Sequence, residues 1–202
     1  MKKQIILATK NNGKVREINS MLSGLDIEAL SLDDVPDAPD VVEDGATFEE
    51  NAFKKASQVA HHTGMMSLAD DSGLEVDALN GAPGIYSARF AGEGASDDMN
   101  NKKLLDELKD IDDGRRTARF RCVMVLYDLS GGWIKSEGVC EGVIARAPRG
   151  GNGFGYDPLF FLPGLGRTMA ELTGEEKNSI SHRAIALKKL MERLPGFLES
   201  HR

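Results

Sequence analysis

The chain has 202 residues, 41% of them hydrophobic, and its 25 Lys and Arg against 32 Asp and Glu give a formal net charge of −7. This length supports a hydrophobic core without disulfide bonds, and the mean hydropathy of −0.32 is typical of a soluble globular chain. The acidic balance argues against a general nucleic-acid coat protein, because phosphate backbones select basic surfaces.

Cysteine content and apolar run length indicate the compartment. Cys122 and Cys140 are too few for a disulfide framework and lack the spacing of a cysteine-rich zinc site. No apolar run approaches membrane-spanning length, and the run at residues 5–8 is too short for a signal peptide. We therefore expect a cytoplasmic protein with no membrane partner, whose two thiols are free and lie in the core.

In the first half of the chain, short apolar runs that predict strands alternate with residues at helical spacing. In order, we expect a strand at 5–8, a helix through 15–22, a loop at 33–45, a helix from residue 47 and strands at 66–69 and 74–78. Thr47 and Glu50 fit a capping box at the start of the second helix.

The second half predicts a long hairpin followed by a C-terminal helix. In order, we expect a polar-faced helix at 96–108, a hairpin of runs 117–128 and 133–147, a Gly-rich loop at 150–155, a strand at 159–162 and a helix with Ile180, Ala184, Leu187, Met191 and Leu194 on its apolar face. Pro195 is expected to end this helix. No repeat or linker divides the chain, so the sequence predicts one mixed α/β domain over residues 1–202.

The polar turn at residues 9–14 lies between the first strand and the first helix, where backbone N–H groups and the positive helix end attract phosphate. It is not a P-loop, because Val15 stands where Ser or Thr would hold magnesium and no glycine lies five residues before Gly13. From the residues alone, a phosphate-binding loop and an ordinary Asn-capped turn both remain open.

Three charged residues lie at positions where a predicted helix or strand would normally be buried. Lys55 shares the apolar stripe of the second predicted helix, so it either extends to the rim or reaches a buried anion. Asp70 and Asp71 follow a predicted strand, where such a pair can hold Mg²⁺ against phosphate oxygens or activate water. The run Asp-Asp-Ser-Gly is also ordinary turn chemistry, and both interpretations remain open.

Aromatic and basic residues gather toward the C-terminal end. Phe154 and Tyr156 lie in the Gly-rich loop, where a ring could stack on a flat ligand or the loop could simply be flexible. Lys177, His182 and Arg183 lie around the start of the last predicted helix, where cations oppose the macrodipole. They are either exposed or bind phosphate or base carbonyl groups. Phosphate, metal and an aromatic ring together indicate a nucleotide.

Six motifs occur along the chain and are jointly specific: Thr9–Lys14, Thr47–Ala52, Ala69–Leu74, Gly81–Arg89, Gly153–Pro158 and Glu176–Arg183. With them the chain resembles the inosine/xanthosine triphosphate pyrophosphatase family, which acts on non-canonical purine nucleotides. The resemblance implies a two-lobed mixed α/β fold with a long central sheet and a substrate cleft between the lobes. It also implies a homodimer and Mg²⁺-dependent hydrolysis of XTP, ITP or dITP to the monophosphate and pyrophosphate.

The same resemblance assigns roles to individual residues. Substrate binding falls to Thr9, Lys10, Asn11, Asn12, Gly13, Lys14, Lys55, Ser72, Phe154, Gly155, Tyr156, Asp157, Lys177, His182 and Arg183. Asp71 is implied as metal ligand and proton acceptor. The family usually has two acidic residues before the glycine that matches Gly45, but here Val42 precedes Glu43 and Asp44. We expect Glu43 to be the second metal ligand, with Asp44 as the alternative.

Specificity is expected at the purine base. Arg183 stands at a predicted helix start, where its charge needs a compensating acceptor, and the purine 6-oxo group would provide one with help from His182. ATP carries an amino group at that position and would be rejected.

Two other functions remain open. A pyrophosphatase for a pyrimidine or modified-base triphosphate is disfavoured by the pair His182 and Arg183. A nucleotide-binding protein without turnover is disfavoured by the paired acids Asp70 and Asp71. Binding to nucleic acid is not expected, because the net charge is −7 and no stripe of alternating aromatic and basic residues occurs.

Overall fold

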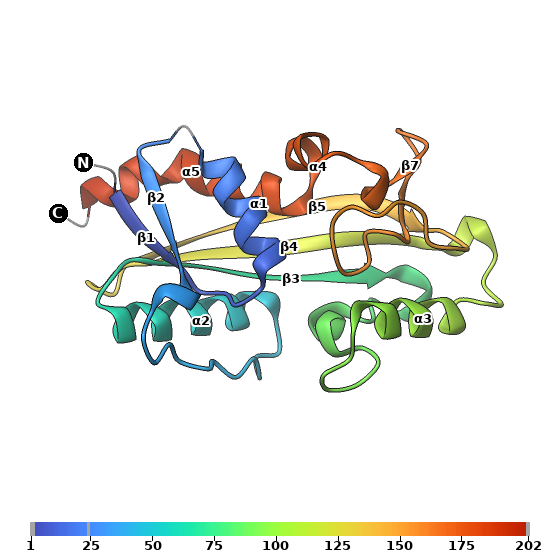
Figure 1. Cartoon of the computed structure of the whole chain (residues 1–202), viewed down its shortest axis with the longest axis horizontal. Coiled ribbons are helices and arrows are strands. Elements are labelled where there is room, and N and C mark those ends of the chain that lie inside the picture. The colour runs from blue at the N-terminus through green and yellow to red at the C-terminus, as the bar shows by residue number, and fades with distance from the viewer. Residues whose placement is uncertain (1–2, 24, 201–202) are drawn as a thin grey trace. The chain divides into compact units, whose positions relative to one another are not determined.

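The computed structural model describes residues 3–23 and 25–200, and in this part of the chain seven strands form one sheet in the order β2-β1-β3-β4-β5-β6-β7 (Figure 1). The strands are β1 (Lys3–Leu7), β2 (Ile27–Ser31), β3 (Ser67–Val76), β4 (Thr117–Tyr127), β5 (Trp133–Ile144), β6 (Phe160–Leu162) and β7 (Arg167–Thr168). The α-helices are α1 (Asn12–Leu22), α2 (Phe48–Thr63), α3 (Asp97–Glu107), α4 (Gly174–Ile180) and α5 (His182–Ser200). The predicted mixed α/β class and long central sheet are confirmed.

The chain divides into two compact units, and each unit is assembled from separate stretches of sequence. Unit 1 comprises residues 1–71, 122–138 and 183–202, and unit 2 comprises residues 72–121 and 139–182. Strands β3, β4 and β5 contribute residues to both units. The two units agree with the two lobes that the resemblance implies, whereas the implied cleft stays a prediction.

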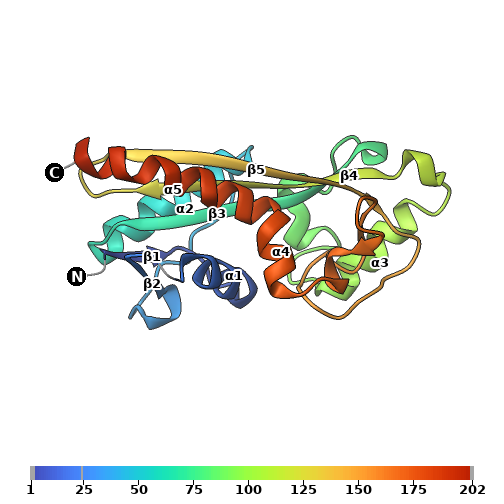
Figure 2. The ribbon, with the colours of Figure 1, turned by 90° about the horizontal axis from the view of Figure 1, so that it is seen from above.

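In unit 1, strand alternation divides the apolar residues between the two faces of the sheet. β1 pairs in parallel with β2 and with β3, with Leu7 opposite Ser31 and Leu68. Alternate residues of β1 and β4 pack with α1 and α5 in one core cluster, which includes Ile5, Leu7, Ile18, Leu22, Leu68, Cys122, Met124, Leu126, Leu187, Leu190 and Leu194. In Figures 1 and 2, α1 and α5 cover one face of these strands and α2 covers the other.

Unit 2 has its own core and carries the Gly-rich loop. Its cluster combines the second part of β3 with α3, β4, β5 and β6, and includes Leu74, Val76, Leu104, Leu108, Ala118, Phe120, Ile144, Tyr156, Leu159 and Phe160. β6 pairs antiparallel with β5 and β7, with Phe161 opposite Val143 and Thr168. The loop between β5 and β6 is therefore anchored at both ends.

The prediction of two short strands around Asp70 and Asp71 is wrong, because β3 runs without a break from Ser67 to Val76. The run Asp-Asp-Ser-Gly favours a turn only locally, whereas β3 has a neighbouring strand on each side in the sheet. Both carboxylates also find cationic partners, described below. The two aspartates thus lie within a central strand and not at its end.

The C-terminal region also differs from prediction. Ser181 has an extended backbone (ψ 154°) and separates α4 from α5, so Ile180 ends α4 and does not belong to the last helix. Pro195 lies inside α5 and does not end it. The buried Leu194 and Phe197 pack into the unit 1 core on either side of the proline, and this packing offsets the hydrogen bond that proline cannot donate.

Two short strands were not predicted, β2 and β7. Residues of β2 are only partly buried, so their apolar pattern is weak, and β7 has two residues. Among the described residues, no helix combines the length and the apolar character needed to span a membrane.

Candidate active site

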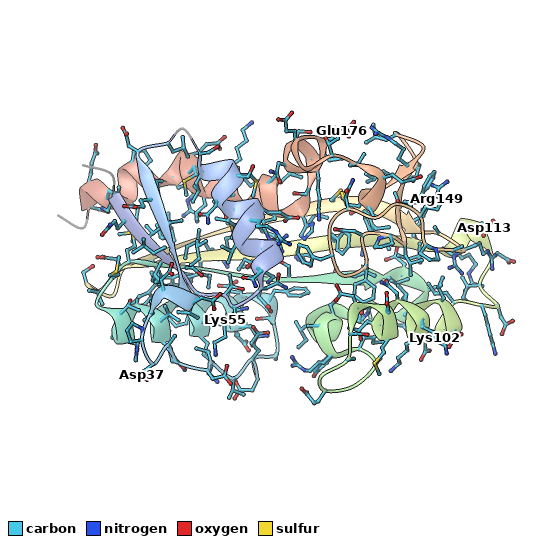
Figure 3. All side chains as sticks on the ribbon, viewed as in Figure 1. Asp37, Lys55, Lys102, Asp113, Arg149 and Glu176 are labelled. Atoms are coloured by element: carbon cyan, nitrogen blue, oxygen red, sulfur yellow. The ribbon has the colours of Figure 1, made fainter. Side chains whose placement is uncertain are left out.

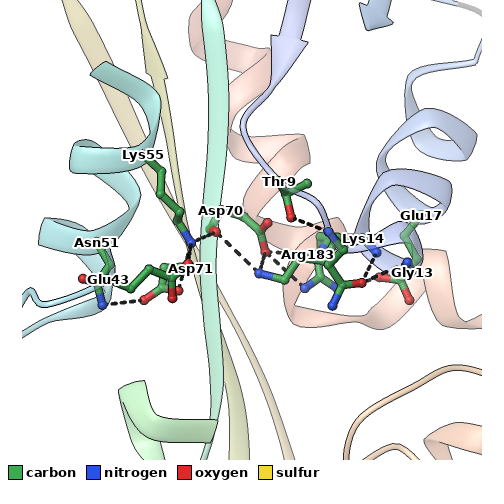
Figure 4. Close-up of polar contacts among 11 residues, drawn as sticks. Thr9, Gly13, Lys14, Glu17, Glu43, Asn51, Lys55, Asp70, Asp71 and Arg183 are labelled. Carbon is green, nitrogen blue, oxygen red and sulfur yellow. Dashed lines mark hydrogen bonds and ion pairs between the residues drawn. The ribbon is translucent and has the colours of Figure 1, made fainter. Parts of the chain in front are cut away.

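Asp70 and Asp71 are consecutive residues of β3 and lie in two different groups of charged side chains, both within unit 1 (Figure 4). Successive side chains of a strand point to opposite faces of the sheet. Asp71 therefore faces α2, whereas Asp70 faces α1 and α5. The repulsion expected between adjacent carboxylates is reduced because each has its own cations.

On the α2 face, Lys55 joins two carboxylates into a group that we call the carboxylate–lysine cluster (Glu43, Lys55 and Asp71). The Lys55 ammonium nitrogen lies 2.8 Å from Glu43 Oε1 and 3.2 Å from Asp71 Oδ1, and it donates to the Asp70 carbonyl at 2.8 Å. Lys55 is 7% exposed on the buried stripe of α2 (Figure 3). Of the two open interpretations, the one confirmed is that Lys55 reaches a buried anion, Asp71.

Both members of the Lys55–Asp71 pair have perturbed proton affinity. Burial lowers the pKa of Lys55, but the charges of Asp71, Glu43 and Asp70, together with the hydrogen bond to Glu43, outweigh burial and hold this pKa above its ordinary value. Burial raises the pKa of the Asp71 carboxyl, although the charges of Lys55 and Lys14 oppose the change. The lysine therefore stays cationic at neutral pH, and Asp71 is a better proton acceptor than an ordinary aspartate.

On the other face, Asp70 is the shared anion of two cations. Its Oδ2 lies 3.0 Å from the Lys14 ammonium and 3.1 Å from Arg183 Nη2, and Arg183 Nη1 lies 2.5 Å from Glu17 Oε2. Arg183 is 2% exposed. The acceptors that compensate its charge are thus two carboxylates of unit 1.

The loop at residues 9–14 is an Asn-capped turn that also delivers a lysine. Asn11 Oδ1 accepts hydrogen bonds from the N–H groups of Gly13 (2.9 Å) and Lys14 (3.1 Å), and Thr9 Oγ1 accepts one from the Asn11 N–H (3.1 Å). Lys10 is exposed and pairs with Asp40 at 3.1 Å. The cap fixes the start of α1 at Asn12, and from there the Lys14 side chain reaches Asp70.

In unit 2, the Gly-rich loop is organised around Asp157. The Asp157 carboxylate accepts the Phe154 N–H at 2.9 Å and forms an ion pair with Lys177, whose ammonium lies 4.9 Å from the centre of the Phe154 ring. Gly153 has φ +77°, and a Cβ on it would lie 2.0 Å from Asp157 Oδ2. The loop is therefore held by specific contacts and is not a loose hairpin connection.

The remaining predicted residues of unit 2 have different surroundings. Tyr156 is buried, and its hydroxyl donates to the Ser87 carbonyl at 2.8 Å, so its ring belongs to the core. His182 is buried and stacks on Phe120, with ring centres 4.8 Å apart. Gly155 donates its N–H to Asp97 at 2.6 Å. Ser72 is partly buried in β3, directly after Asp71.

Sequence reasoning missed two residues of these networks, Asn51 and Glu17. Asn51 Nδ2 donates to Asp71 Oδ2 at 3.2 Å, and Glu17 binds Arg183. Asn51 lies four residues before Lys55 and Glu17 lies three residues after Lys14, so each shares a helix face with a predicted site residue. That spacing was the sequence feature by which both residues could have been predicted.

The carboxylates fit a metal site that is completed by a substrate. The described part of the chain contains no group of three or more His, Cys, Asp or Glu residues that could enclose a metal ion. Asp71 Oδ1 and Glu43 Oε1 do, however, both contact the same Lys55 nitrogen, so they converge on one point. Mg²⁺ is commonly bound by one or two carboxylates together with substrate phosphates, and this pair meets that requirement.

The fold is mixed α/β, its buried acid–lysine networks lie beside a helix start, and its aromatic loop is ordered. These are the features expected of an enzyme that acts on a nucleotide. Comparison with known proteins identifies the family. The chain belongs to the Ham1 family, whose family model matches residues 5–193.

Individual relatives cover nearly the whole chain. It is 55% identical to the dITP/XTP pyrophosphatase of Geobacter sulfurreducens over 191 residues, which is 95% of this chain and 96% of the relative. Among solved structures it is similar to a HAM1 protein from Coxiella burnetii (TM-score 0.86, 45% identity) and to the Ham1 protein of Staphylococcus aureus (TM-score 0.85, 42% identity). Each of these two comparisons covers 96% of this chain and 99% of the other.

Proposed function

We propose that this protein hydrolyses the non-canonical purine nucleoside triphosphates dITP, XTP and ITP to the monophosphate and pyrophosphate, and so removes them from the nucleotide pool. The observation that carries the proposal is the carboxylate–lysine cluster, in which a buried Asp71 with a raised pKa lies 3.2 Å from a buried lysine. Membership of the Ham1 family and similarity to the dITP/XTP pyrophosphatase of Geobacter sulfurreducens support it.

In this proposal unit 1 binds the triphosphate and carries the chemistry. The loop at residues 9–14, Lys14 and Lys55 bind the phosphates and neutralise their charge. Asp71 accepts a proton from water as the water oxygen bonds to the α-phosphorus, and the bond from that phosphorus to the bridging oxygen breaks, releasing pyrophosphate. Asp71 is held for this role by its contact with Lys55, and Lys14 is held by its ion pair with Asp70.

The cofactor of the proposal is Mg²⁺. Asp71 and Glu43 would hold it, and the ion would supply charge neutralisation at the triphosphate oxygens. Glu43 is preferred to Asp44 as the second ligand, because Glu43 shares Lys55 with Asp71. Asp44 instead pairs with Lys54 at 2.6 Å, and its side chain is largely exposed.

Unit 2 is proposed to bind the base. Phe154, which Asp157 holds in place, would stack on the purine. Lys177 and His182 would donate hydrogen bonds to the oxo groups of the base. The loop and the substrate would be supported by Ser72, Gly155 and the buried Tyr156. Arg183 would act beside His182 at the start of α5, where its guanidinium pairs with Asp70 and Glu17. A 6-oxo purine accepts these hydrogen bonds, whereas the 6-amino group of ATP leaves the donors unpaired.

The wider setting is proposed as one catalytic domain over residues 1–202 that acts in the cytoplasm as a homodimer, without nucleic-acid or membrane partners. Sedimentation velocity of the purified protein tests the dimer. A single boundary at twice the chain mass of 21.9 kDa is expected, and a boundary at 21.9 kDa contradicts the dimer.

Pyrophosphate release from a panel of nucleotides tests the activity. With Mg²⁺ present, ITP, XTP and dITP should be hydrolysed about 10- to 100-fold faster than ATP at equal concentration, since one good hydrogen bond to a charged donor contributes about 1.5–3 kcal/mol. Faster release from a pyrimidine nucleotide would favour a different substrate class. Substrates that remain intact after long incubation would favour a binding protein without turnover.

A further inference from the structure

Asn51 is a buried amide that joins two segments of the carboxylate–lysine cluster. It is 1% exposed on α2. Its Oδ1 accepts the Gly45 N–H at 2.8 Å, and its Nδ2 donates to Asp71 Oδ2 at 3.2 Å (Figure 4). One side chain thus connects the loop that precedes α2 to the reactive carboxylate in β3.

Both ends of this amide are matched to the polarity of their partners. The Gly45 N–H needs an acceptor and the ionised Asp71 carboxylate needs a donor, and Asn supplies one of each at a fixed separation. The loop also approaches closely, since a Cβ on Gly45 would lie 2.7 Å from Asn51 Oδ1. An aspartate here would keep the acceptor for Gly45 but would place an oxygen against Asp71 Oδ2.

Together with Lys55, this amide fixes both oxygens of Asp71. Oδ1 receives Lys55 and Oδ2 receives Asn51, so the plane of the carboxylate is set by donors at its two ends. Glu43 binds the same Lys55 and lies two residues before Gly45. The contacts therefore close a ring from Asn51 through Asp71, Lys55 and Glu43 and back along the loop.

We propose that Asn51 is a positioning residue whose amide sets the orientation of Asp71 and its separation from Glu43, the geometry that the proposed hydrolysis requires. The role depends on the proposed function, because it concerns the same acid. Rates of positioned reactions fall steeply with small displacements of the reacting groups. Asn51 itself contacts Asp71 and not the substrate.

The test compares Asn51→Asp with a matched control, Asn100→Asp. Asn100 is a second buried helical asparagine, 3% exposed on α3, which accepts the Ala91 N–H at 2.8 Å and donates to the Ala88 carbonyl at 3.1 Å. Both substitutions turn a donating amide into an oxygen at a bridging position. Only the first faces Asp71.

Four quantities are measured for each variant: the Tm, the kcat and the KM for ITP with Mg²⁺, and the affinity of the nucleotide-free protein for Mn²⁺ by electron paramagnetic resonance. Both variants should lose some thermal stability. Only Asn51→Asp should lower kcat, by about 10- to 100-fold with little change in KM. It should also bind Mn²⁺ more tightly, because it adds a third carboxylate beside Glu43 and Asp71.

A lower kcat at nearly unchanged KM in a folded variant is a result that a purely structural role would not produce. Parental kcat in folded Asn51→Asp, or an equal loss of kcat in Asn100→Asp, would overturn the proposal. Should Asn51→Asp fail to fold, Asn51→Ser replaces it, since a serine hydroxyl is too short to bridge both partners, and the same fall in kcat is required. If the parent does not hydrolyse ITP, the proposed function fails, and Mn²⁺ binding still tests the positioning role. Asn51→Ser adds no charge and loses the contact with Asp71, so it should bind Mn²⁺ more weakly than the parent, whereas parental affinity would overturn the role.

Discussion

Arg183 and Asp70 lie 113 residues apart in the sequence and form a buried ion pair, with Nε and Nη2 of the guanidinium 3.3 and 3.1 Å from the same carboxylate oxygen. The pair fixes the start of α5 against β3. Since Asp70 also binds Lys14, the position of a phosphate-side lysine depends on an arginine that the resemblance assigns to the base.

Replacing Arg183 should therefore affect all nucleotides alike. In Arg183→Lys the charge remains but the fork that reaches both Asp70 and Glu17 is lost, so Tm should fall and the rates with ITP and ATP should decrease by the same factor. The ITP-to-ATP ratio of kcat/KM should change by less than about threefold, because the lost contacts are within the protein.

Lys177→Met is the variant with which Arg183→Lys is compared, since Lys177 pairs with Asp157 and holds the Gly-rich loop of unit 2. There the ITP-to-ATP ratio should drop about 10- to 100-fold. A large drop of the ratio in Arg183→Lys instead would assign the guanidinium to the base.

Asp71→Asn tests the proton acceptor. The change preserves shape but removes the charge that accepts a proton and pairs with Lys55, so pyrophosphate release from ITP should fall about 100-fold or more. Circular dichroism should still show a folded protein. Asp113→Asn, in an exposed pair with Arg146, is the control and should keep its rate. Near-parental activity of Asp71→Asn would remove Asp71 from the mechanism.

Glu176 is expected to contribute to the stability of the fold in a way that is lost at acidic pH. The hydrogen bond from Arg167, together with the Thr173 N–H, lowers the pKa of Glu176 from 4.5 to about 2. A carboxyl whose pKa is lower in the folded state stabilises the fold above its unfolded pKa, and this stabilisation is lost as the pH falls toward the folded value. The Tm difference between the parent and Glu176→Gln should thus be present at neutral pH and shrink between pH 4.5 and about pH 2.

The matched control for that measurement is Glu175→Gln, at the exposed neighbouring position of the same helix. It separates loss of the Arg167 contact from the general loss of one negative charge. A Tm difference for Glu176→Gln that stays constant across this pH range would show that the ion pair contributes nothing to folding.

The two thiols should be inert in the native protein. Cys122 and Cys140 are free and buried, as predicted, and burial raises the pKa of the Cys140 thiol to about 11. A thiol reagent at mildly alkaline pH should therefore react only after unfolding, because the thiolate is the reactive form. The double Cys→Ala variant should keep its ITP activity, and complete loss of activity in a folded variant would contradict a purely structural role.

Most elements and the separate parts of the site could be predicted from local sequence. Lys55 was recognisable because a lysine on an apolar stripe has to find an anion or the rim. The continuity of β3 was not, because the turn preference of Asp70–Gly73 is local whereas the strand is held by neighbours distant in sequence.

The acceptors of Arg183 could not be predicted from the sequence for a similar reason. Its charge at a helix start indicated a compensating acceptor, but Glu17 lies 166 residues away and only the fold brings the two together. Asn51 was overlooked because a helical asparagine usually faces solvent, and its spacing of four from Lys55 gains meaning only once Lys55 is known to be buried.

The uninterrupted path of β3 also bears on how the protein loses activity. Reactive groups on surface loops can be released by local opening at little cost, well before the rest of the molecule melts. Asp71 instead lies within the uninterrupted strand β3, three residues beyond Leu68, where the pairing of β3 with β1 ends. Amide hydrogen exchange at residues 67 and 68, where β3 pairs with β1, should then be among the slowest in the chain, and heat inactivation should coincide with global unfolding.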